Sequence, residues 1–176
     1  MSLNKKIISI LVMCSTCFLP NIATALPTDK EQPINVSADK ARKAGNQGTT
    51  TYLGNVVITQ GSIRITGEEI IIYDDKGAVS KIIATGTPAE FRQRPQINEP
   101  ETIAIGSTIE YDINQETLSI EGAAKLNQGG DTTTSNKITY DINSSIVNAG
   151  DDNGRVNMTL TPSNSSTNTN TSQTAP

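Results

Sequence analysis

Apolar and polar residues alternate along most of the chain. Ile63 and Ile65 share one parity, as do Ile103 and Ile105. The same alternation is present in Ile109, Tyr111 and Ile113, in Leu118 and Ile120, in Ala124 and Leu126, in Ile138, Tyr140 and Ile142, and in Val156, Met158 and Leu160. In a β-strand this spacing places the apolar side chains on one face and the polar ones on the other. No segment shows a 3.6-residue period, so we expect an all-β chain, with no helix beyond a turn or two near residues 99–101.

Three segments share a further pattern. Each has an apolar residue two positions before a Tyr-Asp pair, followed by a polar turn, an apolar strand and a glycine. The pairs are Tyr73-Asp74, Tyr111-Asp112 and Tyr140-Asp141, which are spaced 38 and then 29 residues apart. Asp, Asn and Gly at the breaks favour turns. Repeated strand-turn units that cannot bury an apolar face alone predict a stacked or rolled antiparallel sheet.

The first 25 residues have the organisation of a Sec signal peptide. Lys5 and Lys6 form a charged start, residues 7–19 are apolar, and Ala23-Thr24-Ala25 is an A-x-A cleavage site. The apolar run is shorter than the ~20 residues that span a bilayer, which favours cleavage over a membrane anchor. The mature chain is therefore expected to begin near residue 26, outside the cytoplasm.

The rest of the chain divides by composition into three parts. Residues 26–32 are expected to be a flexible N-terminus, and residues 33–162 to be one folded domain. Residues 163–176 have no apolar side chain larger than alanine or proline, so they are expected to form a disordered tail. Both cysteines, Cys14 and Cys17, lie in the signal segment. The domain therefore has no disulfide and depends on an ordinary core or an extended sheet.

Composition argues against catalysis, metal binding and nucleic-acid binding. The chain has no histidine, and once Lys5 and Lys6 are removed 12 basic and 18 acidic residues leave a net charge of −6. Binding to nucleic acid needs a clustered basic face, and no dense carboxylate loop of the calcium type is present. Neighbouring carboxylates occur as Glu68-Glu69, Asp74-Asp75 and Asp151-Asp152. Neighbours in a strand point to opposite faces and do not converge on one glycosidic bond, so we expect no catalytic residues, no metal site and no cofactor.

The interior of this domain is expected to be mostly Ile, Val, Leu and Ala. Its aromatic residues are Phe91 and the tyrosines Tyr52, Tyr73, Tyr111 and Tyr140. An ordinary sandwich fills its interior with larger side chains, since aromatic residues bury 150–250 Å² each. Two explanations remain open at this point: two layers pressed closely together and filled by small aliphatic residues, or two layers that splay to leave an apolar groove.

Several strings in the domain resemble the OstA family. These are "QPINVSAD" from Gln32, "GNVVITQGSIRITGEEI" from Gly54 and "GTPAEFRQ" from Gly86, together with the three Tyr-centred strands. The resemblance implies a β-jellyroll of antiparallel strands that is V-shaped in cross-section and carries open edge strands at both ends. It further implies a periplasmic carrier that moves lipopolysaccharide along an interior groove and that has no enzymatic activity.

The same resemblance implies partners. Copies are expected to join head to tail and to bridge LptC at the inner membrane and LptD at the outer membrane. The edge residues expected at the joints are Ile34, Asn35, Val36, Ser37 and Ala38 at one end and Arg155, Val156, Asn157, Met158, Thr159 and Leu160 at the other. Both segments carry few of the features that normally block a free strand edge.

Acyl chains of lipid A are expected to supply the binding energy, because a domain with net charge −6 is a poor ligand for phosphate. The residues expected to face the lipid are Ile34, Val36, Val56, Ile58, Ile63, Ile65, Phe91, Tyr111, Ile113, Leu126, Tyr140 and Met158. Two alternatives stand beside this hypothesis. One is another OstA-family periplasmic protein of the same pathway, and the other is a structural β-repeat protein with a closed core that binds no lipid.

Overall fold

A computed structural model describes residues 29–44, 48–94, 99–151 and 154–162. The expected signal peptide (1–25) and the expected disordered tail (163–176) lie outside these ranges. Within them the chain forms ten β-strands and one short 3-10 helix, η1 (Asp29–Glu31). The strands are β1 (Asn35–Ser37), β2 (Lys40–Ala44), β3 (Thr49–Gln60), β4 (Ile63–Asp75), β5 (Ala78–Gln93), β6 (Thr102–Asp112), β7 (Thr117–Gln128), β8 (Asp131–Asp141), β9 (Ile146–Ala149) and β10 (Asn157–Thr159). No helix in the described ranges has the length and apolar character needed to cross a membrane.

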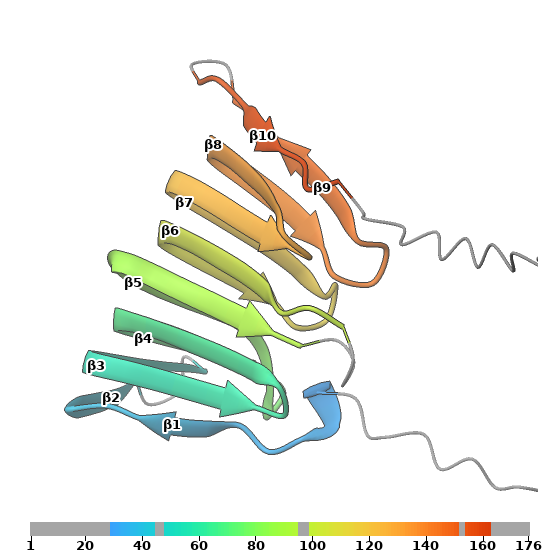
Figure 1. Ribbon diagram of the computed structural model, residues 1–176. Coiled ribbons are helices and arrows are strands. Elements are labelled where there is room, and N and C mark those ends of the chain that lie inside the picture. The colour runs from blue at the N-terminus through green and yellow to red at the C-terminus, as the bar shows by residue number, and fades with distance from the viewer. Residues whose placement is uncertain (1–28, 45–47, 95–98, 152–153, 163–176) are drawn as a thin grey trace, which may run out of the picture.

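All ten strands belong to one antiparallel sheet, in the order β1-β3-β4-β5-β6-β7-β8-β10 (Figure 1). The short strands β2 and β9 pair with β3 and β8, alongside β1 and β10. The first and last strands in this order do not pair with each other, so the sheet stays open at both ends. The expected all-β antiparallel fold with open edge strands is confirmed.

Each of the five strands from β3 to β7 is interrupted near its middle. The pairing register shifts at Leu53/Val56, Thr66/Glu69, Thr85/Ala89, Ile105/Thr108 and Glu121/Ala124. Such bulges bend a strand and increase its twist. Because the shifts lie side by side across neighbouring strands, they form one kink that divides the sheet into two halves.

We call these halves the first and the second layer. The first layer holds residues 49–53, 69–75, 78–85, 108–112, 117–121 and 137–141, with β2 and β9 at its edges. The second layer holds residues 56–60, 63–66, 89–93, 102–105, 124–128 and 131–135, with β1 and β10 at its edges. The apolar faces of the two layers turn toward each other and form one core.

Glycine occupies the kink in every one of the five interrupted strands. The residues are Gly54, Gly67, Gly86, Gly106 and Gly122. A Cβ atom on Gly106 would lie 2.7 Å from Cγ2 of Ile120 and 2.9 Å from the carbonyl oxygen of Glu121, and Gly122 has a φ of +75°. The kink therefore depends on the absence of side chains where neighbouring strands approach most closely.

The kink also reverses the parity of β6, which overturns one expectation from the sequence. Before the bulge Thr102 and Ala104 are buried, and after it Ile109 and Tyr111 are buried. Ile103 and Ile105, which share a parity and look like inward residues, are only half-buried and lie on the outer face. The prediction from alternation was wrong here, because a bulge places residues of opposite parity on the same face.

The Tyr-Asp pairs mark turns, as the repeat predicts. Oδ1 of Asp112 accepts a hydrogen bond from the amide of Gln115 at 2.9 Å, and Oδ1 of Asp141 accepts one from the amide of Ser144 at 2.8 Å. Glu116 follows the first of these with a φ of +52°. These carboxylates stabilise hairpin turns, which accounts for them without a catalytic role.

Replacing Gly106 by Ala tests the kink. The added methyl group would crowd Ile120 and the backbone of β7, so we expect the free energy of unfolding in urea to fall by about 1–3 kcal/mol. Lys125→Ala, on the exposed face of the neighbouring strand, is the control and should change it by less than about 0.5 kcal/mol. Equal effects of the two substitutions would contradict the role given to Gly106.

Candidate functional site

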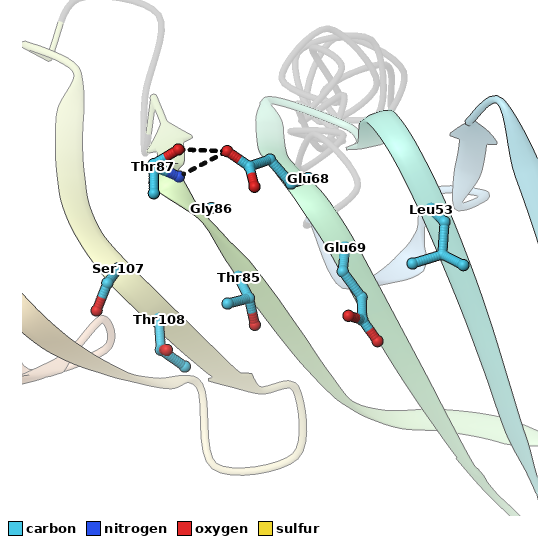
Figure 2. Close-up of a pocket in the computed structure, with 8 residues that line it drawn as sticks. All are labelled: Leu53, Glu68, Glu69, Thr85, Gly86, Thr87, Ser107 and Thr108. Carbon is cyan, nitrogen blue, oxygen red and sulfur yellow. Dashed lines mark hydrogen bonds between the residues drawn. The ribbon is translucent and has the colours of Figure 1, made fainter.

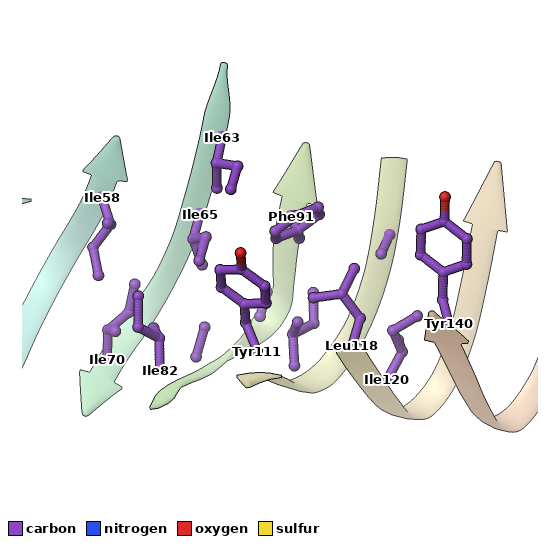
Figure 3. Close-up of a cluster of buried hydrophobic side chains, with 14 of the residues drawn as sticks. Ile58, Ile63, Ile65, Ile70, Ile82, Phe91, Tyr111, Leu118, Ile120 and Tyr140 are labelled. Atoms are coloured by element: carbon purple, nitrogen blue, oxygen red, sulfur yellow. The ribbon is translucent and has the colours of Figure 1, made fainter. Parts of the chain in front are cut away.

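The interior between the two layers is the candidate site, and in this structure its own side chains fill it. Its members are exposed by 6% or less and form one cluster (Figure 3). They are Val56, Ile58, Ile63, Ile65, Ile70, Ile72, Ile82, Ala84, Ala89, Phe91, Ala104, Ile109, Tyr111, Leu118, Ile120, Ala124, Leu126, Ile138 and Tyr140. Side chains such as Ile58 and Phe91, at 0% exposure, leave no room for a water molecule beside them.

Phe91 and Tyr111 show how the two layers meet. Phe91 belongs to the second layer and Tyr111 to the first, and their ring centroids lie 5.6 Å apart at an interplanar angle of 59°. This tilted geometry is favourable for two aromatic rings. Figure 3 shows the two side chains within the same cluster. The layers are therefore in contact through these residues rather than separated by an open groove.

The residues expected to face lipid fall into three groups by burial. Ile34, Val36 and Ile113 are half-buried and pack against the core, and Met158 is 56% exposed. The other eight belong to the core: Val56, Ile58, Ile63, Ile65, Phe91, Tyr111, Leu126 and Tyr140. The structure thus brings eleven of the twelve to one apolar interior, while their contact with lipid stays a prediction.

The residues expected from the sequence to face lipid leave out much of the first layer's contribution to this interior. Ile70, Ile72 and Ile82 are buried, as are Leu118 and Ile120. Three consecutive isoleucines, at positions 70 to 72, hide the alternation that would have separated the inward pair from the outward residue between them. Alternation already placed Leu118 and Ile120 on one face, and their pairing with Tyr111 and Ile109 shows that this face is the interior one.

Both segments expected at the joints lie at the ends of the strand order. In β1, Val36 lies opposite the buried Ile58, and in β10, Met158 lies opposite the buried Thr133. Residues directly opposite in an antiparallel pair share a face of the sheet. Val36 and Met158 are therefore on the interior side of the second layer, at its two ends.

The C-terminal end of the sheet exposes more apolar surface than is usual for a strand edge. Val156, Met158 and Leu160 are 44%, 56% and 66% exposed, and Ile146 in β9 is 55% exposed. Edges that stay unpaired usually carry charge or proline. At the other end, β2 carries the exposed cations Lys40, Arg42 and Lys43. Sequence reasoning identified β1 and β10 but missed β2 and β9, which form the edges of the first layer.

A pocket of about 470 Å³ lies at the kink, away from the apolar interior (Figure 2). Its lining is Leu53, Glu68, Glu69, Thr85, Gly86, Thr87, Ser107 and Thr108. Oε1 of Glu68 accepts a hydrogen bond from the amide of Thr87 at 3.2 Å and another from its hydroxyl group. None of the residues expected to face lipid is part of this lining, and Glu68 stabilises the bend between β4 and β5.

Several charged side chains of the described ranges form ion pairs. Nε of Arg92 lies 2.5 Å from Oε1 of Glu90, and Nη1 lies 3.3 Å from Oε2 of Glu101. The hydrogen bond to Glu90 raises the pKa of Arg92, with the charge of Glu101 adding to it. In the part of the chain that the structure describes, no three His, Cys, Asp or Glu side chains gather in a way that would hold a metal ion.

Comparisons with known proteins agree on one group. Residues 35–146 match the family described as LptA/(LptD N-terminal domain) LPS transport protein. The lipopolysaccharide export system protein LptH of Pseudomonas aeruginosa is 41% identical over 131 residues, which cover 74% of this chain and 75% of that protein. The lipopolysaccharide export system protein LptA of Escherichia coli (strain K12) is 30% identical over 157 residues, covering 87% of this chain and 84% of that protein.

A solved structure supports the same group. It is the crystal structure of LptH from Pseudomonas aeruginosa, described as the LptA-homologous periplasmic component of the conserved lipopolysaccharide transport device. It matches with a TM-score of 0.73 and 37% identity, covering 77% of this chain and 100% of that chain. The resemblance to the OstA family and the all-β antiparallel fold with an open sheet are confirmed.

Tyr111 gives the closed interior a measurable signature. Burial raises the pKa of its hydroxyl group to about 12, and the charges of Glu116, Asp29 and Asp112 contribute. We expect one of the four tyrosines to ionise near pH 12 in an alkaline titration followed at 295 nm, and this step to be missing in Tyr111→Phe.

The raised pKa of Tyr111 also makes the stability of the folded protein depend on pH. The unfolded chain loses the Tyr111 proton near pH 10 and the folded chain near pH 12, so the contribution is complete below pH 10 and is lost as the pH rises between these values. Above pH 10 the stability of Tyr111→Phe should therefore fall less than that of the parent protein. Ionisation of Tyr111 near pH 10 would show that its hydroxyl group is open to water.

Proposed function

This chain belongs to the LptA/(LptD N-terminal domain) family of lipopolysaccharide transport proteins, and from that premise we propose that it is a periplasmic carrier holding the acyl chains of lipopolysaccharide between its two layers. The main support for the proposal is the continuous apolar interior, which reaches Val36 of β1 at one open end of the sheet and Val147 of β9 at the other. The signal segment expected in residues 1–25 supports a location in the periplasm.

The energetics of this interior suit capture as well as release. Each CH₂ group removed from water contributes about 0.8 kcal/mol, so a few sheltered acyl chains supply ample affinity. The layers are held together by aliphatic and aromatic contacts. An acyl chain that enters between them replaces these contacts with its own apolar contacts to each layer. The cost of parting the layers is offset in this way, and no directional bond holds the lipid in one place.

We propose no catalytic role. The Asp residues of the Tyr-Asp pairs at 112 and 141 are hydrogen bonded to turn amides, and Glu68 is bonded to Thr87. The energy that drives transport is then supplied elsewhere, and this protein provides the apolar path along which the lipid moves.

The open edges support assembly by strand addition. β1 and β10 lie at opposite ends of the sheet, so β10 of one copy can pair with β1 of the next. Val36 and Met158 would then lie on the same side of the joint and continue the apolar interior from one copy to the next. The same edges would accept LptC at one end and LptD, whose N-terminal domain belongs to the same family, at the other.

Site-specific photo-crosslinking tests lipid binding. A photo-reactive amino acid in place of Ile34, Phe91 or Ile113 should form adducts with purified lipopolysaccharide, because all three side chains contact the interior. The matched control is Arg64, which lies between two buried isoleucines and points outward. Absence of adducts at all three interior positions would favour a closed structural β-protein that binds no lipid.

Truncation tests assembly. A chain ending at Asn153 lacks β10, so its sedimentation velocity should show loss of the larger species that the parent protein forms. A chain ending at Pro162 keeps β10 and is expected to assemble as the parent does. Undiminished assembly of the shorter chain would exclude β10 as a joining strand.

A further inference from the structure

The ends of the strands in both layers meet on one side of the molecule. Because every long strand bends at its middle, the turn after β3 in the second layer and the turn after β6 in the first layer lie opposite the kink. We call this side the mouth. The short helix η1 lies at the mouth, beside the strand ends (Figure 1).

Several hydrogen bonds attach this N-terminal segment to the second layer. Oδ1 of Asp29 accepts from the amide of Ser62 at 2.6 Å. Oδ2 of Asp29 accepts from Oγ of Ser62 at 2.7 Å and from Nε2 of Gln93 at 2.9 Å. Nε2 of Gln60 donates to the carbonyl oxygens of Lys30 and Gln32 at 3.2 and 3.1 Å. Residues 29–32, expected to be flexible from composition, are thus held by side chains from β3, β5 and the turn after β3.

The same segment reaches the first layer through an ion pair. Nζ of Lys30 lies 2.6 Å from Oε1 of Glu116, in the turn between β6 and β7. The hydrogen bond to Glu116 raises the pKa of Lys30, so the lysine stays charged. Half of the Lys30 side chain is exposed to solvent, so this ion pair contributes only modestly to stability.

The surrounding residues fit this segment closely. Gly61 has a φ of +57°, and a Cβ atom there would lie 2.3 Å from Oδ1 of Asp29. Gln60 and Gln93 are only 4% and 9% exposed, although they lie at the margin of the interior. Oε1 of Gln93 is buried without a hydrogen-bond partner. These amides are polar groups at the inner margin of the mouth, and the segment covers them.

We propose that residues 29–32 form a strap that closes the mouth between the two layers, and that its release from Glu116 opens the interior to acyl chains. The inference rests on the proposed function, since it names the step that admits the lipid. The strap stays bound to the second layer through Asp29 while the ion pair of Lys30 breaks. Its release from Glu116 exposes the hydroxyl end of Tyr111, whose pKa is raised by burial and by the charges of both Glu116 and Asp29, while the amides of Gln60 and Gln93 stay bonded to the strap.

The strap itself can be tested without lipid. Asp29→Ala removes its main attachment, so the ionisation of Tyr111 should shift from about pH 12 toward pH 10 as water reaches the hydroxyl group. Asp29→Asn is the matched control: it removes the same charge but keeps an oxygen that accepts from Ser62. We expect a clearly smaller shift in Asp29→Asn. Equal shifts in both variants would mean that only the charge of Asp29 acts on Tyr111, and the strap would be rejected.

Lipid entry provides the second measurement. A carbodiimide joins a lysine amine to a carboxylate in direct contact, so it should form an amide between Lys30 and Glu116 and lock the strap. Uptake of fluorescent lipopolysaccharide should be abolished in the locked protein. It should be about tenfold faster in untreated Asp29→Ala, if the strap holds the open form at about a tenth of the population. Glu116→Gln treated with the same reagent controls for modification of other groups and should keep its own uptake rate.

The outcomes separate the two proposals. Binding of lipopolysaccharide with the same rate in the locked, parent and Asp29→Ala proteins would overturn the strap and leave the carrier function intact. No binding by any of them, together with the difference in Tyr111 ionisation between Asp29→Ala and Asp29→Asn, would overturn the carrier function and leave a strap that closes the interior for stability alone.

Discussion

The apolar contact between the two halves of each bent strand is the interaction on which the structure depends. A flat sheet of this length would leave one apolar face in water. The five glycines at the kink let each strand fold back, so that Phe91 of one layer meets Tyr111 of the other. The core, the two open ends and the mouth all follow from this bend. A side chain at Gly106 would therefore disturb the arrangement of the layers as well as its immediate neighbours.

An interior closed by its own side chains is compatible with a carrier when the closure is reversible. The layers are continuous at the kink, whereas at the mouth they are joined by Lys30 and Glu116, a partly exposed pair. Contacts between aliphatic groups have no direction, so acyl chains can take the place of the opposite layer at little cost. The same non-directional contacts therefore supply the binding energy, permit release and let the lipid move along the interior.

Part of this structure could be predicted from sequence. Alternation predicted that the chain is built of strands, and the Tyr-Asp pairs predicted turns. The lack of blocking residues predicted that β1 and β10 are edge strands. The reversal of parity at Gly106 could not be predicted, because alternation carries no information on where a bulge lies. The closed state of the interior depends on how far two layers approach, which composition leaves open. Asp29 was missed because its partners, Ser62 and Gln93, are distant in sequence.

A crystal structure of the protein with lipopolysaccharide bound would show whether hydrocarbon enters between the layers. We expect acyl chains in contact with Phe91, Tyr111 and Leu118, with the two aromatic rings farther apart than the 5.6 Å of the closed form. A complex with the rings at their present separation and the lipid on the outer face of the sheet would show that the interior does not hold the lipid.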